Sequence, residues 1–315
     1  MKTEPLEPIN EGEVLVKSLY LSVDPYMRIQ QSANNTWEAP YPLNKVQAGG
    51  VVGEVVQSKY EGLKPGDIVN AGYGWQTYGI VQGNTVRKID PSWGPITTAI
   101  GILGMPGRTA YFGLFDAGKA KAGETVVVSG AAGAVGSIVV QLAKIKGCRV
   151  VGIAGSETKI KYLKEELGAD VALNYHNFTD IQSTKKALEE ACPNGIDVYF
   201  DNTGGVVTDA VMFLINLRAR IIICGQISQY NGKLDEPEMA PRFLHHILYK
   251  RATIQGILAR DYMARMNEML NEMVPWLKEG KLKNLETVVE GFDSLPNALN
   301  SLFHGANNGK LVVKV

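Results

Sequence analysis

The segment Ser129–Gly136 is rich in glycine and alanine and carries the clearest chemical signal of the sequence. It follows the β-branched run Thr125–Val128 and precedes a helical pattern that ends at Lys146. A strand, a turn of small residues and a helix, in that order, bring backbone N–H groups up to a diphosphate. In the pattern G-x-G-x-x-G the first glycine is replaced by Ala131. The segment predicts a dinucleotide site, and a glycine-rich turn without a ligand is the alternative.

The end of the next predicted strand, at Gly155 and Ser156, indicates which dinucleotide to expect. NAD-binding proteins place an acidic residue about 20 positions after the turn, where it holds the ribose hydroxyls. Here the strand ends in small residues, which leave room for a 2′-phosphate, and Lys159 and Tyr175 follow as donors to it. The pattern therefore favours NADPH over NADH. Glu157 argues mildly against this interpretation, and the alternative for Lys159 is an ordinary solvated lysine.

Cysteine and histidine are too scattered for the usual metal sites and activated nucleophiles. The first residue of either type along the chain is Cys148, whereas zinc sites need such ligands at close spacing. His245 and His246 are adjacent, so on a helix they point in different directions. Cys224 ends a predicted strand near the cofactor, or is a small buried filler. No G-x-S-x-G motif occurs, so we expect neither a metal centre nor a hydrolase.

Tyrosines are the remaining candidates for an acid near the cleft. Tyr230 lies on a loop after a predicted strand, at the edge of the sheet that should face the cofactor. Tyr26 lies on a loop of the N-terminal region that can face the same cleft, and Asn202 follows another strand, where it can contact the nicotinamide ribose. Tyr73 and Trp75 form an apolar wall for a substrate or fill the end of a barrel. For each tyrosine, an ordinary half-buried packing role is the alternative.

The chain changes its pattern twice. Residues 1–103 alternate in short strands punctuated by glycine, which indicates a partly closed antiparallel barrel. Residues 104–275 alternate buried strands with helices, such as one predicted over Val207–Leu217, and this order is typical of an α/β doubly wound parallel sheet. Residues 276–315 end in the predicted strand Lys310–Val315, which is expected to complete the first barrel. A ligand is expected in the cleft between the two domains.

Composition excludes several classes of function. Basic and acidic residues balance to a formal net charge of zero, so no net field attracts nucleic acid or an anionic membrane. No apolar run reaches the roughly 20 residues that span a bilayer, and the polar N-terminus is unlike a signal peptide. Three scattered cysteines do not suggest a disulfide framework, so a cytoplasmic location is expected.

A resemblance covers nearly the whole chain. The sequence resembles the zinc-independent branch of the medium-chain dehydrogenase/reductase superfamily, near the prostaglandin reductases, plant double-bond reductases and bacterial curcumin reductases. Besides the glycine-rich turn, the motifs that carry it are residues 20–28 (YLSVDPYMR), 105–114 (MPGRTAYFGL), 201–205 (DNTGG), 224–231 (CGQISQYN) and 307–310 (NNGK). The zinc ligands of other branches are missing at residues 24–26 and 49–51.

The resemblance implies a Rossmann domain at residues 104–275, inserted in a GroES-like β-barrel domain formed by residues 1–103 and 276–315. It implies a homodimer and NADPH as cofactor. Tyr230 is the candidate catalytic residue because of its place on a strand-end loop and because a metal or histidine acid is not expected. The candidate substrate contacts are Tyr26, Tyr73, Trp75 and Arg108, the last where close relatives often carry an apolar residue. The cofactor contacts inferred from motif and resemblance together are Met105, Thr109, Ala132, Gly133, Ala134, Val135, Gly136, Gly155, Ser156, Lys159, Tyr175, Asn202, Cys224, Gly225, Gln226, Ile227, Ser228, Tyr230, Ile257, Leu258, Ala259 and Asn307.

The leading hypothesis is an NADPH-dependent reductase of the carbon–carbon double bond of enones and enals. Hydride goes to the β-carbon, and Tyr230 stabilises the enolate oxygen. The alternatives are an NADPH quinone reductase and a non-catalytic NADPH-binding protein. The second is suggested because family members usually carry a further strand and hairpin ahead of the position of Pro5.

Overall fold

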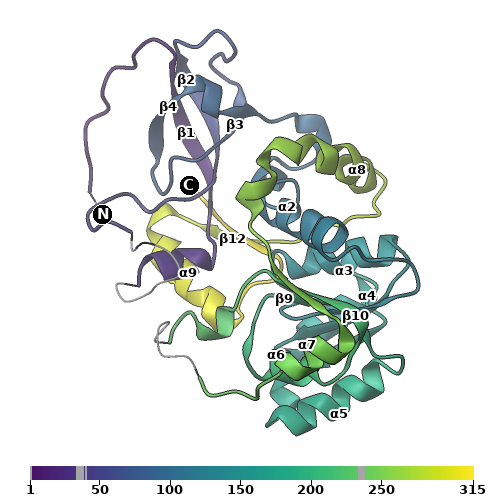
Figure 1. Ribbon diagram of the computed structural model, residues 1–315. Coiled ribbons are helices and arrows are strands. Elements are labelled where there is room, and N and C mark those ends of the chain that lie inside the picture. Colours follow the sequence, from purple (N-terminus) through teal and green to yellow (C-terminus); the bar gives the residue numbers. More distant parts are fainter. Residues whose placement is uncertain (1, 33–38, 40, 233–237) are drawn as a thin grey trace.

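The computed structural model describes residues 2–32, 39, 41–232 and 238–315. Two sheets organise these residues (Figure 1). One is mostly antiparallel and lies with both termini at the upper left of the view. The other is parallel, is flanked by helices and lies at the lower right. Loops of the two sheets meet, as the hydrogen bond from the Gly309 N–H to the Ala132 carbonyl shows.

The first sheet joins the two ends of the chain. Its strands run in the order β12-β13-β1-β2-β3-β5, and β4 also pairs with β1. β13 is antiparallel to β1, which confirms that the last strand completes the N-terminal sheet. The bounds are β1 Glu13–Ser22, β2 Val51–Ser58, β3 Ile68–Ala71, β4 Tyr78–Gln82, β5 Arg87–Lys88, β12 Glu286–Glu290 and β13 Lys310–Lys314.

The second sheet is parallel throughout and has the strand order β11-β10-β9-β6-β7-β8. This is the doubly wound order of a Rossmann fold, in which the chain reverses direction across the sheet between β6 and β9. A ligand binds outside the carboxyl ends of the strands at this point. The bounds are β6 Thr125–Val128, β7 Arg149–Ala154, β8 Val171–Asn174, β9 Ile196–Asp201, β10 Ile215–Ile223 and β11 Thr253–Gly256.

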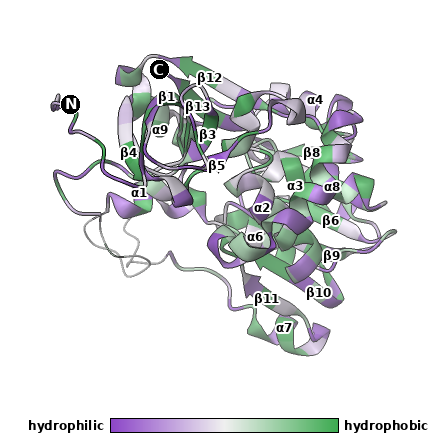
Figure 2. Cartoon of the chain, turned by 90° about the horizontal axis from the view of Figure 1, so that it is seen from above, coloured by the Kyte–Doolittle hydropathy of each residue, from purple (hydrophilic) through white to green (hydrophobic). Residues whose placement is uncertain are grey.

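Helices cover both faces of the parallel sheet. One core packs α2, α3, α4 and α8 on one face, and another packs α5 and α6 on the other. The hydropathy colouring of Figure 2 shows hydrophobic residues along β9 and β10. The bounds are α1 Tyr26–Gln30, α2 Met105–Phe112, α3 Gly136–Ile145, α4 Glu157–Glu165, α5 Ile181–Ala191, α6 Gly205–Met212, α7 Leu244–Lys250, α8 Met266–Lys278 and α9 Leu295–Ser301.

Two details of the parallel domain differ from the sequence prediction. The helix predicted over Val207–Leu217 ends at Met212, and β10 starts at Ile215, where it pairs with Ile196 of β9. The apolar residues of the strand continued the apolar pattern of the helix, so periodicity alone placed the boundary too late. Strand β11 was not predicted, because all four of its residues are exposed and give no buried apolar run.

Candidate functional site

The glycine-rich turn connects β6 to α3 at the strand-order reversal. Gly130 has a φ of +57°, and a Cβ on Gly136 would lie 2.3 Å from the carbonyl oxygen of Gly130. Only glycine at position 136 therefore lets the helix start so close to the turn. Ala131, the departure from the motif, is accommodated because Gly152 on β7 leaves space beside its methyl group. The imperfect motif thus folds into a tight phosphate-binding type of turn.

The end of β7 forms the corner predicted to hold a 2′-phosphate. Ser156 caps α4, since its Oγ accepts a hydrogen bond from the Lys159 N–H at 3.3 Å. The Tyr175 hydroxyl lies over Gly155, where a Cβ would be 2.7 Å from its oxygen. Lys159 Nζ donates to the Gly305 carbonyl at 2.7 Å, and burial lowers the pKa of this amine. The carboxylate of Glu157 accepts from Asn174 Nδ2 at 2.7 Å, away from Lys159's amine contact.

That corner fits an extra phosphate. It presents an ammonium and a hydroxyl beside a residue without a side chain, and the one carboxylate nearby in sequence, Glu157, already has a partner.

The segment before β13 in the barrel domain contacts the glycine-rich turn. Gly309 N donates to the Ala132 carbonyl at 2.8 Å, and Gly309 forms a bridge with Gly133. Asn307, a predicted cofactor contact, donates from Nδ2 to the Gly309 carbonyl at 2.7 Å. The structure therefore brings this residue to the turn from far along the chain. Asn307 was predicted to contact the cofactor, but the pairing of its segment with the turn is a tertiary feature that local sequence does not encode.

Loops after β9 and β10 form the other side of the site. Asn202 Nδ2 donates to the Ser129 carbonyl at 2.7 Å, which holds this predicted residue against the turn. The N–H of Ser228 donates to the Thr203 carbonyl at 3.2 Å, so the two loops lie together. Cys224 has its pKa raised to about 12 by burial, so its thiol is protonated at neutral pH.

Helix α2 and the loop after β11 add the remaining predicted cofactor contacts. Thr109 Oγ1 donates to the Met105 carbonyl, at 2.9 Å, within the helix. Ile257 is buried and its N–H donates to the Ile223 carbonyl at 3.0 Å. Arg108 Nε donates to the Ala259 carbonyl at 2.8 Å, so this arginine, predicted to line the substrate entrance, holds the loop after β11.

Tyr230 is 8% exposed and lies on the loop after β10. Its hydroxyl oxygen accepts a hydrogen bond from the Gln226 N–H at 3.1 Å. Its ring packs with Ile29 of α1, so the barrel domain covers it. Burial raises the pKa of Tyr230, which keeps the phenol protonated and able to donate at neutral pH.

The aromatic residues predicted for the substrate side pack into the barrel. The Tyr73 hydroxyl bonds to Ser18 Oγ at 2.8 Å, and burial raises the pKa of Tyr73 to about 12. Trp75 Nε1 donates to the Ser22 carbonyl at 3.0 Å. Tyr26 packs against the same hydrophobic cluster as both. The polar atoms of Tyr73 and Trp75 are thus bonded inside the barrel, which leaves their rings for any substrate contact.

A buried ion pair beneath this region was missed by sequence reasoning. Lys310 Nζ lies 3.1 Å from Asp24 Oδ1 and donates to the carbonyls of Val23 and Leu311. It ties β13 to the loop that starts α1. A lysine in a C-terminal strand gives no local signal that its side chain points inward.

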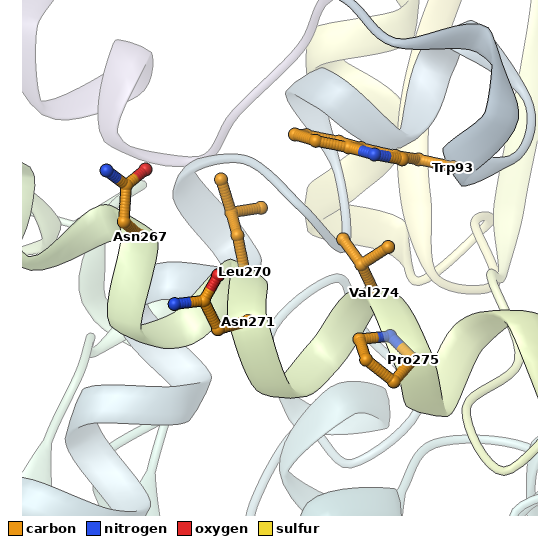
Figure 3. Close-up of a pocket in the computed structure, with 6 residues that line it drawn as sticks. All are labelled: Trp93, Asn267, Leu270, Asn271, Val274 and Pro275. Carbon is orange, nitrogen blue, oxygen red and sulfur yellow. The ribbon is translucent and has the colours of Figure 1, made fainter.

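A hollow of about 280 Å³ lies elsewhere, between α8 and the segment that carries Trp93. Figure 3 shows the Trp93 ring above Leu270 and Val274 of the helix. The hollow is lined by Trp93, Asn267, Leu270, Asn271, Val274 and Pro275. None of these is among the predicted site residues. The strand-end site is therefore defined by hydrogen-bonded loops and not by this hollow.

Two negative findings hold for the part of the chain that the structure describes. No group of three or more His, Cys, Asp or Glu side chains is placed to hold a metal ion. No helix in it is both long and apolar enough to cross a membrane.

Comparisons with known proteins match both parts of the chain. Residues 1–89 match a family model described as the N-terminal domain of oxidoreductase, and residues 134–279 match one described as zinc-binding dehydrogenase. The NADPH-dependent curcumin reductase of Escherichia coli is 42% identical over 97% of this chain and 88% of its own length. Prostaglandin reductase 1 of mouse is 43% identical over 100% of this chain and 93% of its own.

A solved structure agrees with the sequence relatives. The crystal structure of CurA from Vibrio vulnificus in complex with NADPH superposes with a TM-score of 0.91 at 41% identity. The match covers 99% of this chain and 93% of that one.

Proposed function

Since the chain belongs to the medium-chain dehydrogenase/reductase superfamily, in the branch of the prostaglandin and curcumin reductases, we propose that it reduces the carbon–carbon double bond of α,β-unsaturated ketones and aldehydes. It is an NADPH-dependent oxidoreductase. The observation that carries the finer proposal is the buried, protonated hydroxyl of Tyr230 on a loop of the cofactor site. Reduction of an enone needs such a donor at the carbonyl oxygen, where negative charge develops.

Each set of site residues would have its own role in the proposed reaction. The turn from Gly130 to Gly136 would bind the diphosphate through backbone N–H groups, and Lys159 and Tyr175 would bind the 2′-phosphate. When bound, NADPH supplies a hydride, which the β-carbon of the substrate accepts. Tyr230 would donate a hydrogen bond to the substrate's carbonyl oxygen and so stabilise the enolate. Protonation of the α-carbon, by solvent or a tyrosine, completes the reduction.

The hydrogen bond from the Gln226 N–H strengthens Tyr230 in this role. An amide that donates to the phenol oxygen polarises the O–H bond, and the surrounding burial raises the strength of the bond it then makes. Ile29 and Phe303, which pack around Tyr230, exclude water from it.

The test replaces Tyr230 with phenylalanine and measures turnover of NADPH with matched enones, enals and quinones. Turnover of enones should fall by about ten- to a thousand-fold, because one donor to the developing negative charge is lost. Tyr162→Phe is the matched control, because this half-buried tyrosine lies on α4, outside the loop. Unchanged turnover in the Tyr230 variant removes that residue from the mechanism. Reduction of quinones with no reduction of enones by the wild-type protein contradicts the proposed substrate class.

We also propose that the protein forms a homodimer through the β11 edge of the parallel sheet. All four residues of β11 are exposed, and β10 is its sheet neighbour on one side. On adjacent α7, Leu244, Leu248 and Tyr249 are largely exposed. An open strand edge beside exposed apolar side chains is a ready surface for pairing with a second copy.

Light scattering after size exclusion tests this assembly. The wild-type protein should have the mass of a dimer, and Leu248→Lys should shift it toward the monomer. A monomeric wild-type protein contradicts the assembly and leaves the reductase proposal standing.

A further inference from the structure

Asp201 is a fully buried carboxylate at the carboxyl end of β9, at the point where the strand order reverses. Burying a charge is costly unless hydrogen bonds compensate it. Hydrogen bonds from five donors surround this carboxylate. Its donors are Ser129 Oγ at 2.9 Å, Tyr199 Oη at 3.0 Å, Thr203 N at 3.0 Å, Gly204 N at 2.9 Å and Thr208 Oγ1 at 2.7 Å.

The Ser129 hydroxyl links this carboxylate to the glycine-rich turn. It donates to Asp201 and accepts from the Asn202 N–H at 2.9 Å and the Thr203 N–H at 3.3 Å. Ser129 directly precedes Gly130, the residue with the positive φ. The first residue of the turn is therefore bonded to the loop after β9 from both its side chain and, through Asn202 Nδ2, its carbonyl.

The backbone of Asp201 reaches the third loop. Its carbonyl accepts hydrogen bonds from the Cys224 N–H at 2.8 Å and the Gly225 N–H at 3.1 Å. The loop that carries Tyr230 is thus hydrogen-bonded to Asp201 where it leaves β10. One residue, buried between β6 and β10, contacts the loops that follow β6, β9 and β10.

We propose that Asp201 is a positioning residue, which fixes the three strand-end loops of the cofactor site in one arrangement before the cofactor binds. The inference rests on the proposed function, because these loops are the cofactor site there. The geometry of the cofactor site, which is built mostly from backbone groups, then depends on one buried side chain that need not touch the cofactor. A displacement of about 1 Å in such groups can cost about a hundred-fold in function.

Asp197 provides a matched control on the same strand. Its carboxylate accepts from the Thr125 N–H at 2.8 Å and from Asn216 Nδ2 at 2.9 Å. It therefore joins β6 and β9 in the same way as Asp201 does, but at the amino end of the sheet. Asp197→Asn and Asp201→Asn both exchange a carboxylate oxygen for an amide nitrogen, at opposite ends of β9.

The experiment measures dissociation constants for NADPH and NADH by titration of the full-length protein, together with the melting temperature. Asp201→Asn should weaken NADPH binding by about ten- to a hundred-fold. NADH binding should weaken by the same factor, because Lys159 and Tyr175 belong to a different corner of the site. Asp197→Asn should lower the melting temperature and leave both constants within about two-fold of the wild type.

Ser129→Ala keeps the test decisive if Asp201→Asn does not fold. It removes the hydroxyl that donates to Asp201 and accepts from the Asn202 and Thr203 N–H groups, but it keeps the carboxylate in place. It should weaken NADPH binding in the same direction. Unchanged affinity in Ser129→Ala, or affinity loss in Asp197→Asn equal to that in Asp201→Asn, overturns the positioning role. Failure of the wild-type protein to bind NADPH overturns the proposed function instead, so the two failures are distinguishable.

Discussion

The two domains use their polar side chains in opposite ways. In the parallel domain, polar groups at the strand ends hold loops whose backbone faces the site, as Asn202 does by bonding to Ser129. In the barrel, Tyr73 and Trp75 direct their polar atoms inward and bond to their own domain. A tyrosine or tryptophan whose sequence position suggests a substrate contact can therefore have its polar atom bonded inside its own domain. Substitutions in each domain test this difference between the two sets of polar side chains.

The largest effect is expected for Gly136→Val in the parallel domain. A Cβ there would lie 2.3 Å from the Gly130 carbonyl oxygen, so the turn must move. NADPH should bind at least about a hundred-fold more weakly, since backbone donors lose their alignment. Titration with NADPH checks this. Gly72→Ala is the control in the barrel domain, because a Cβ there meets nothing within 4 Å. A valine variant that binds like the wild type contradicts the assigned turn.

The barrel domain should respond most strongly to Lys310→Met, and in stability instead of cofactor affinity. The substitution leaves Asp24 buried without its cation, which costs about 3–5 kcal/mol of unfolding free energy. The double variant Asp24→Asn/Lys310→Met should recover most of that loss, because no unpaired charge is left. Urea unfolding measures both. A single variant as stable as the wild type shows that the pair does not hold the barrel together.

A more selective effect is expected for Lys159→Ala at the predicted 2′-phosphate corner. Loss of a hydrogen bond to a charged group is worth about 1.5–3 kcal/mol, which corresponds to about ten- to a hundred-fold in NADPH affinity. NADH affinity should stay unchanged, because it lacks that phosphate. Lys161→Ala is the control, since this lysine is exposed on the same helix and pairs with Glu165. Equal losses for both cofactors would show that Lys159 acts through Gly305 and not through the phosphate.

The smallest effect is expected for Tyr73→Phe in the barrel. The variant loses the hydrogen bond to Ser18 and should be less stable by about 1 kcal/mol. The ring stays in place, so kcat/KM for an enone should not change. Thermal unfolding and steady-state kinetics measure the two quantities. A fall in kcat/KM without a fall in stability would place the Tyr73 hydroxyl on the substrate.

Much of the parallel domain was predictable because its signals are local. The order of strand, turn and helix around Gly136 lies within one short segment, and the small residues at Gly155 and Ser156 end β7 directly before α4. Element boundaries were harder, as the late end predicted for α6 shows. Strand β11 escaped prediction, since exposed strands lack the hydrophobic periodicity on which such predictions depend.

The site itself was predictable only in part. Residue types and motif order indicated Lys159, Asn202, Tyr230 and Asn307. The structure places Lys159 in the first turn of α4 and the other three on loops after β9, after β10 and before β13. The contact between Gly309 and Ala132 has no local signature, because it joins the two ends of the fold.

Local sequence was enough to indicate the dinucleotide turn, most of the order of elements and the small-residue corner that favours NADPH. These depend on neighbouring residues, whose backbone preferences and sizes act over a few positions. Only the tertiary structure decided which polar groups face the cleft, that Lys310 is buried beside Asp24, and that Asp201 meets Ser129 across the sheet. Burial and hydrogen-bond partners are set when distant segments pack, so no short window of sequence contains them.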